Sequence, residues 1–197
     1  MQVAGMICTI LFAMPLFAGE RMTVSVCTRG HLDKRVELGA EAAAASLFHS
    51  MNIEIVWAKC EAGLEGDDAV QQHWFTLRLR DGRPFIKPAP AALDTLGEAF
   101  LPVDNGGYIV EVYYQAVQAV ATAKGAELTR LLGCVIAHEL GHLLLGPGHA
   151  AEGVMRPAWD RRDLEAIRQG CLRFSPVEAA SMRRVLQGTV QSPATAP

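Results

Sequence analysis

The sequence predicts an α/β fold in which a mixed, twisted and mostly parallel sheet has helices packed on it. Short segments that alternate apolar and polar residues, typical of half-buried strands, occupy much of the first half of the chain. An Ala-rich segment with helical spacing separates the first two, and such a strand–helix–strand opening predicts a right-handed parallel crossover. Only helical patterns follow the last strand, which predicts a small helical C-terminal subdomain.

Three strands and one long helix are predicted at the start. Residues 22–28 and residues 74–80 alternate apolar and polar side chains, and the short segment 53–57 is a further strand. Residues 32–51 carry apolar side chains at near-helical spacing and contain no proline. This segment is therefore predicted to form a helix that packs on the sheet.

Two more strands and their connections complete the predicted sheet. Residues 99–102 predict a short strand, the segment 104–107 a turn, and residues 108–113 the return strand. The acidic segment 61–72 and the proline-containing segment 81–92 are predicted loops.

Four helices are predicted after the last strand. Residues 115–124 form the first, and the apolar segment 127–145 forms the second. A short helix over residues 160–167 begins at an acidic N-cap. The last helix runs from Ser175 to residue 187 and has proline at its first position and glutamate at its third.

The N-terminus has the pattern of an export signal. Residues 3–18 form an apolar run that is too short for a comfortable membrane span and ends in small residues before charge returns. We expect residues 1–18 to be a signal peptide cleaved near Ala18, which predicts a secreted or periplasmic protein without a stable membrane span. An uncleaved anchor, or a true start at Met22, are the alternatives.

Composition limits the function classes. The net charge is −3 and the isoelectric point is about 6.1. There is no basic cluster, so a nucleic-acid-binding surface is not expected. The length of 197 residues and the absence of repeats predict one domain, over residues 19–187, and we expect a monomer. The small, polar tail 188–197 is predicted to be disordered.

Four cysteines remain after the predicted cleavage. An even number in an exported chain permits disulfides, but the sequence does not determine their connectivity. Cys27 and Cys60 each end a predicted strand, so they are the better pair. Cys134 lies in an apolar helix and is predicted to be a buried thiol. The fourth is Cys171.

The chemistry of the chain is concentrated in one motif on the second of the four C-terminal helices. His138-Glu139-x-x-His142 places two imidazoles four residues apart, on the same face of a helix, where both can reach one metal ion. Glu139 can approach a water on that metal and act as a general base.

His149 is the predicted third ligand. Residues 146–148, Gly-Pro-Gly, end the helix, so the chain can turn and bring His149 back toward the pair. Three protein ligands and one open position are typical of a catalytic zinc. Glu165, on the short helix that follows, is the alternative third ligand.

Two other candidates are weaker. Cys134 lies one turn before His138, so Cys134, His138 and His142 span about 12 Å along the helix and cannot converge on one ion. Glu152 is close to the motif in sequence but lies in the turn.

This pattern resembles the metzincin clan of zinc peptidases, which carry HExxHxxGxxH and then a tight turn with a methionine beneath the metal. The matching residues are His138, Glu139, His142, Gly146 and His149, with Val154-Met155-Arg156-Pro157 as the candidate Met-turn. Three residues separate His142 from Gly146 where the clan has two. The extra residue extends the helix by about 1.5 Å and rotates its exit by about 100°. We expect the Gly-Pro-Gly loop to absorb this shift.

The resemblance implies a zinc-dependent peptidase with a single catalytic domain over residues 19–187 and peptide or protein substrates. Zn²⁺ held by His138, His142 and His149 would activate a water, with Glu139 as the general base.

The resemblance also implies where a substrate would lie. The strand at 108–113 would be the sheet edge that binds an extended peptide by strand addition. Gly106 and Gly107 could let the substrate backbone approach closely. Trp159 could line the cleft, although core packing is the favoured interpretation of this residue.

Two other functions remain open from the sequence alone. The chain could be an exported zinc-binding domain without turnover, because a motif does not show that the cleft is open. It could also be an exported interaction module with an accidental HExxH, which would bind no metal.

Overall fold

The computed structural model describes residues 19–60, 74–82, 95–100 and 108–188. The predicted signal peptide, the loop at 61–72, the turn at 104–107 and the tail beyond residue 188 lie outside the described residues.

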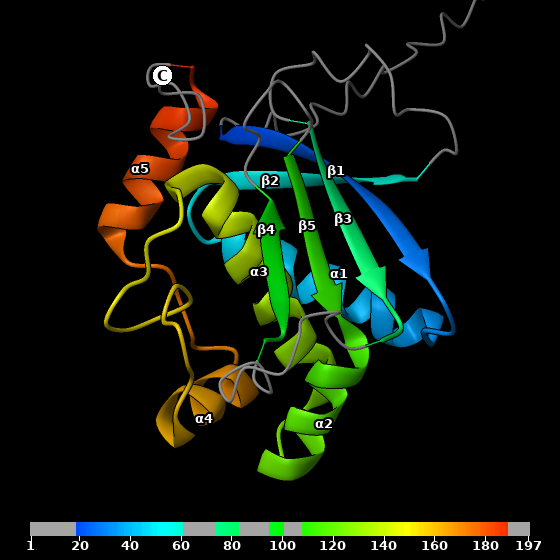
Figure 1. Cartoon of the computed structure of the whole chain (residues 1–197). Helices are drawn as coiled ribbons and strands as arrows, with labels where there is room; N and C mark the ends of the chain where they lie inside the picture. The colour runs from blue at the N-terminus through cyan, green and yellow to red at the C-terminus, as the bar shows by residue number, and fades with distance from the viewer. Residues whose placement is uncertain (1–18, 61–73, 83–94, 101–107, 189–197) are drawn as a thin grey trace, which may run out of the picture.

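The sheet has five strands in the spatial order β2-β1-β3-β5-β4 (Figure 1). The strands are β1 (Glu20–Arg29), β2 (Ile53–Lys59), β3 (Trp74–Arg80), β4 (Gly97–Phe100) and β5 (Tyr108–Tyr113). The pairings β1–β2, β1–β3 and β3–β5 are parallel, and only β4 runs antiparallel to its neighbour among the described strands. The predicted mixed, mostly parallel sheet is therefore confirmed.

The predicted edge of the sheet is wrong. The strand at 108–113, β5, pairs on one side with β3, where Val110 faces Leu77, and on the other side with β4, where Val110 faces Ala99. The edge is therefore β4, which begins two residues before the predicted segment 99–102. The sequence pattern of two neighbouring strands shows that they can pair, but not which of them lies outward.

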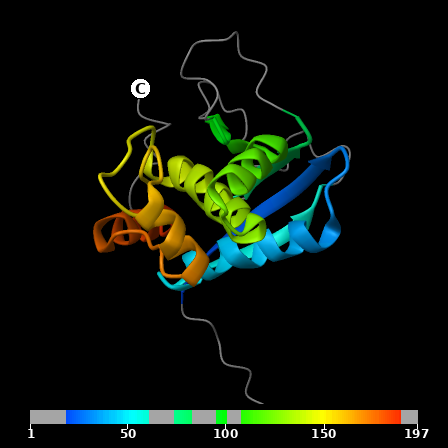
Figure 2. The ribbon, with the colours of Figure 1, turned by 90° about the horizontal axis from the view of Figure 1, so that it is seen from below.

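Five helices accompany the sheet, and α1 and α3 cover one of its faces (Figures 1 and 2). The helices are α1 (Lys34–His49), α2 (Tyr114–Lys124), α3 (Leu128–Leu145), α4 (Arg161–Gln169) and α5 (Pro176–Leu186). Small residues let α1 and α3 approach closely. A Cβ added to Gly133 of α3 would lie 2.6 Å from the Cβ of Ala43 and 2.8 Å from the carbonyl oxygen of Ala40.

The helix α3 is the central element of the molecule. It contacts the four other helices and both strands at the β4 edge of the sheet. It is long and apolar enough to cross a membrane by composition alone, but 78% of it is buried inside the fold, as expected for the core helix of a globular domain. Residues on α3 are therefore held by packing on several sides.

The C-terminal helices begin where the sequence predicts. Asp160 and Ser175 are the N-caps of α4 and α5, and each forms a capping box with the residue three positions later. The small C-terminal helical part follows from these local signals.

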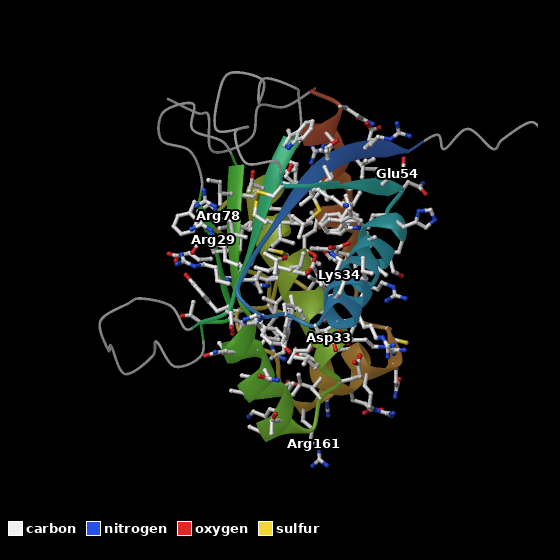
Figure 3. The ribbon with its side chains drawn as sticks, turned by 90° about the vertical axis from the view of Figure 1, so that its right-hand side faces the viewer. Arg29, Asp33, Lys34, Glu54, Arg78 and Arg161 are labelled. Carbon is white, nitrogen blue, oxygen red and sulfur yellow. A yellow bond between two sulfur atoms is a disulfide. The ribbon has the colours of Figure 1, made fainter. Side chains whose placement is uncertain are left out.

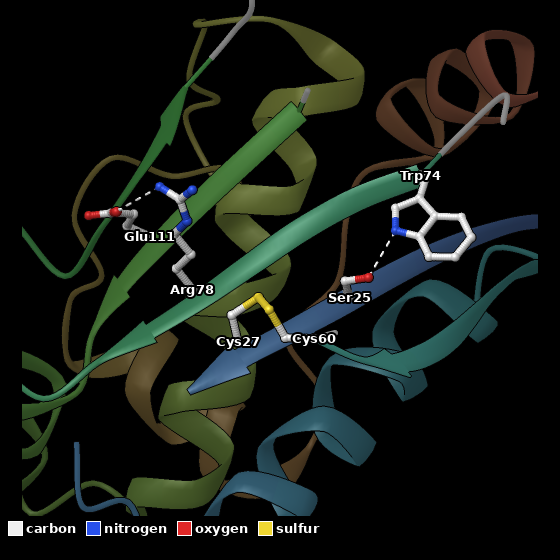
Figure 4. Close-up of a disulfide and its surroundings, with 6 residues drawn as sticks. All are labelled: Ser25, Cys27, Cys60, Trp74, Arg78 and Glu111. Atoms are coloured by element: carbon white, nitrogen blue, oxygen red, sulfur yellow. Dashed lines mark hydrogen bonds and ion pairs between the residues drawn. A yellow bond between two sulfur atoms is a disulfide. The ribbon is translucent and has the colours of Figure 1, made fainter. Parts of the chain in front are cut away.

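The predicted disulfide is confirmed. Cys27 of β1 and Cys60, directly after β2, are bonded, with their Cα atoms 4.8 Å apart (Figure 4). Between the neighbouring strands β3 and β1, the indole Nε1–H of Trp74 donates a hydrogen bond to Ser25 Oγ at 2.9 Å. Cys134 is buried and free, as predicted, and Cys171 is free and exposed.

Candidate active site

The two motif histidines lie one turn apart on α3, as the sequence predicts. Their Nε2 atoms are 3.1 Å apart, and their ring centroids are 4.7 Å apart. His142 is buried and His138 is partly buried.

Backbone carbonyls fix the orientation of both rings. Nδ1–H of His138 donates to the carbonyl oxygen of Val154 at 2.7 Å, and Nδ1–H of His142 donates to that of Gly146 at 2.9 Å. A carbonyl oxygen only accepts, so each Nδ1 carries the proton and each Nε2 keeps its lone pair. Partners of this kind are typical of histidines that ligate metals.

The facing Nε2 atoms fit a shared metal ion. Two nitrogen lone pairs at 3.1 Å repel each other unless a cation lies between them. A tetrahedral zinc with Zn–N bonds of about 2.0–2.1 Å places its ligand nitrogens about 3.3 Å apart. The spacing of His138 and His142 is close to that value.

His149 lies beside the pair. Its ring centroid is 5.3 Å from that of His138 and 4.8 Å from that of His142. One ring nitrogen from each of the three histidines lies within 4.8 Å of the others. These are the three residues that the motif predicts as ligands, and the fold brings them together.

The turn between the helix and His149 absorbs the extra residue of the motif. The helix continues to Leu145, and Gly146 then takes φ 88° and ψ −171°, a region that is essentially restricted to glycine. The Gly146 N–H donates to the His142 carbonyl oxygen at 2.8 Å. The chain reverses at this glycine, which returns His149 to the helix despite the longer spacing.

Glu165, the alternative third ligand, is not part of this group. Its carboxylate accepts hydrogen bonds from Arg168 at 2.5 and 2.8 Å and from Gln169 at 2.5 Å. The Arg168 guanidinium is the main reason that the pKa of Glu165 is lowered to about 2. The geometry favours His149.

Glu139 is buried between α3 and the edge strand β4. Burial, with a smaller contribution from the charge of Glu98, raises the pKa of Glu139 to about 8. Burial also lowers the pKa of His138 to about 4 and lowers that of His142, with the neighbouring histidines adding to both shifts. Neutral imidazoles are the form that ligates a metal.

Gly97 is a site residue that the sequence interpretation missed. A Cβ at this position would lie 2.7 Å from Cγ and 2.8 Å from Oε1 of Glu139. Gly97 therefore leaves the room that the Glu139 side chain occupies. Nothing in the local sequence indicates this contact, because Gly97 and Glu139 are far apart along the chain.

Met155 packs against α3 at Gly141, next to His142 in sequence. It is 1% exposed, and a Cβ on Gly141 would lie 2.5 Å from its Sδ. The segment around it is fixed by backbone hydrogen bonds: Val154 N–H donates to Arg173, and Ala150 N–H donates to the Met155 carbonyl. The Val154 carbonyl that accepts from His138 belongs to the same segment.

Trp159 lies next to the site as well as against the core. Its ring stands edge-on to that of His138 with a centroid distance of 5.9 Å, and its Nε1–H donates to the Gly153 carbonyl oxygen at 3.3 Å. The expectation of core packing is therefore incomplete, since part of the indole faces the histidines. The site thus has an aromatic wall on this side.

Comparisons with known proteins bear on the fold. No family model matches the chain, and no curated protein matches its sequence. Among solved structures, it is similar to archaemetzincin from Methanopyrus kandleri, with a TM-score of 0.52 and 15% identity over 86% of this chain and 98% of that one. Metalloproteinase-II from Bacteroides fragilis gives a TM-score of 0.47 and 14% identity over 80% of this chain and 54% of that one. The predicted fold class is confirmed: the chain has the α/β fold of the archaemetzincin structure.

Proposed function

We propose that this protein is a zinc-dependent peptidase in which His138, His142 and His149 hold the metal. The observation that carries the proposal is the convergence of three imidazole nitrogens within 4.8 Å. Both helical rings are oriented by backbone carbonyls with Nε2 free. The likeness in fold to an archaemetzincin is consistent with this function.

When bound, zinc supplies a Lewis acid that polarises the substrate carbonyl and lowers the pKa of a water. The protein supplies the proton transfer. A carboxylate oxygen of Glu139 accepts the proton of the attacking water and passes it to the leaving amine. Without metal, burial raises the pKa of Glu139 to about 8, and the charge of a bound zinc would lower it and favour the ionised carboxylate that acts as the base.

Met155 supports the proposal as the methionine of a Met-turn. It packs against the helix at Gly141, the residue directly before the second histidine. The turn also carries the Val154 carbonyl that fixes the His138 ring. We infer that the turn supports the ligands from below and does not touch the substrate.

The edge strand β4 is the proposed binding site for the peptide backbone. It is the last strand of the described sheet, and its Gly97 contacts Glu139. An extended peptide added to this edge would run past the base and the histidines. β4 replaces the strand at 108–113 (β5) in this proposed role, because β5 is paired on both sides.

Export remains part of the proposal. The bonded Cys27 and Cys60 fit an oxidising compartment, in which disulfides persist. A secreted or periplasmic peptidase is consistent with the apolar N-terminal segment.

The test combines metal content with turnover. Purified wild-type protein is expected to contain about one zinc per chain by elemental mass spectrometry and to hydrolyse a mixture of unstructured peptides. Glu139→Gln keeps the shape of the side chain but removes the base. It is expected to keep the zinc and to lose turnover by at least about 100-fold.

Three outcomes would contradict the proposal in different ways. Protein without metal would point to an accidental motif. Zinc without hydrolysis of any peptide would point to a binding domain. Full turnover in Glu139→Gln would exclude Glu139 as the base.

A further inference from the structure

A pocket of about 810 Å³ lies beside the histidine site, between the end of α2, the start of α3 and the helix α4. This volume is in the range of pockets that bind small ligands or single side chains. The proposed mechanism does not use it.

Trp159 joins the pocket to the metal site. The indole lines the pocket and also stands edge-on to the His138 ring at a centroid distance of 5.9 Å. A peptide whose scissile carbonyl lies at the histidines can therefore place a neighbouring side chain over Trp159 and into the pocket.

The acidic groups of the pocket already have partners. Asp160 accepts from Arg156 at 2.7 Å and also caps α4. Glu165 is held by Arg168. These carboxylates have pKa values lowered to about 2, mainly by their arginine partners, so they stay ionised and paired.

Two cationic side chains of the pocket have no partner among the described residues. Lys124, at the end of α2, and Arg161, at the start of α4, line the pocket and are exposed. Neither side chain has a hydrogen bond or ion pair with another described residue. Figure 3 shows Arg161 at one end of the molecule, with its side chain directed outward. The chain as a whole carries a net charge of −3, so this local excess of positive charge is not a property of the general surface.

The arginines of a second pocket, in contrast, are bonded to the backbone. It has a volume of about 320 Å³ and also contains two arginines, Arg173 and Arg183. Their guanidinium groups donate to backbone carbonyls, those of Gly170 and Leu172 for the first and that of Met51 for the second. These arginines hold the fold together, whereas Lys124 and Arg161 have no such role.

We infer that the pocket beside Trp159 is a substrate subsite for an acidic side chain, an inference that rests on the proposed peptidase function. A glutamate or aspartate next to the scissile bond would pass Trp159 and pair with Lys124 and Arg161. The guanidinium can hold a carboxylate through two parallel hydrogen bonds, and the Lys124 ammonium adds a point charge.

The main test is the sequence preference of the zinc-loaded full chain. Cleavage sites in a peptide mixture are mapped by mass spectrometry, and glutamate or aspartate should be enriched at one position beside the scissile bond. A matched pair of peptides that differ only as Glu or Gln at that position then gives a ratio of kcat/KM. We expect the ratio to favour Glu by about three- to ten-fold at low salt, as for solvent-accessible charge pairs that act together.

Charge variants assign the preference to the pocket. Lys124→Gln and Arg161→Gln should each reduce the Glu-to-Gln ratio, and the double variant should bring it to about one. Arg161→Glu should shift the preference toward lysine. Arg162→Gln is the matched control, because Arg162 is equally exposed on the same helix but does not line the pocket. A ratio near one in the wild type, or an equal loss in Arg162→Gln, would overturn the subsite and leave the peptidase function standing.

A binding measurement separates the two proposals. N-acetyl-glutamate amide and its neutral glutamine analogue are titrated into the zinc-loaded chain, and the indole N–H signal of Trp159 and the amide signal of Gly125 are followed by NMR. The acidic probe should shift both signals more than the neutral one, and the double variant should abolish the difference. If the chain cleaves no peptide but gives this result, the anion site is retained and the proposed peptidase function is rejected. Equal shifts with both probes would overturn the subsite.

Discussion

His142 and His149 belong to the same proposed metal site, but the chain holds them in different ways. His142 is buried in the central helix, and its Nδ1–H is bonded to a backbone carbonyl. His149 is exposed on the loop that follows the Gly146 turn. The helix side of the site is fixed by packing before any metal binds, whereas the loop side can adapt. This difference explains how one extra residue after His142 is tolerated, while the spacing within the helix allows no such change.

The difference predicts unequal losses of zinc affinity. We expect His142→Ala to weaken zinc binding by more than about 100-fold, because it removes a proposed ligand whose ring is held in place by the Gly146 carbonyl. We expect a smaller loss in His149→Ala, since the exposed loop leaves room for a water to take the vacated position. Competition with a chromophoric chelator measures both.

Glu165→Ala is the matched control for this measurement. It removes the alternative ligand on α4, and its zinc affinity should equal that of the wild type. A loss of zinc in Glu165→Ala with normal binding in His149→Ala would reverse the assignment of the third ligand.

The buried side of the site also predicts how stability depends on pH without metal. The pKa of Glu139 rises from 4.5 to about 8 on folding, so the unfolded chain releases a proton that the folded chain keeps. The free energy of unfolding therefore falls as pH rises through this window, by at most about 5 kcal/mol. His138, whose pKa falls from 6.5 to about 4, acts in the opposite direction: stability is lost as pH falls through that window. Between about pH 4.5 and 6.5 the two effects on the free energy of unfolding oppose each other. Stability should therefore be greatest in this range.

Urea unfolding with a chelator present, over a series of pH values, measures this dependence. Glu139→Gln should lack the decline above about pH 6.5 that the wild type shows. The same decline in both proteins would show that another group causes it.

Substitutions at two glycines are expected to have the smallest effects. One glycine lies on the helix side of the site and the other on the loop side, so their effects on stability compare the two sides. Gly141→Ala places a Cβ 2.5 Å from the Sδ of buried Met155, and we expect it to destabilise the fold by about 1–3 kcal/mol. Gly148→Ala, on the loop, meets nothing within 4 Å and should change stability by less than about 0.5 kcal/mol. Equal changes in thermal unfolding would mean that the loop is as tightly packed as the helix.

The same contrast describes what the sequence could predict. The positions of His138, Glu139 and His142 follow from helical spacing alone, and the return of His149 follows from a glycine turn close by in sequence. Local signals also predict the caps at Asp160 and Ser175.

Contacts between distant segments could not be predicted in this way. Either strand of the β4–β5 pair could lie outward. The pairing of β5 with β3 leaves β4 at the edge. The fit of Gly97 against Glu139, and of Trp159 against His138, depends on how separate elements pack in three dimensions. These contacts also lie on the proposed substrate side of the site.

The hydrogen bond from His138 to the Val154 carbonyl has a thermodynamic consequence. It connects a proposed metal ligand, His138, to the segment that begins the C-terminal helical part, and Val154 in turn is bonded to Arg173 ahead of α5. Because such coupling is reciprocal, the free energy by which metal orders this segment equals the free energy by which the ordered segment tightens metal binding. If the proposed metal binds, we therefore expect the order of the chain beyond residue 150 to report metal occupancy, although none of the three histidines lies within it.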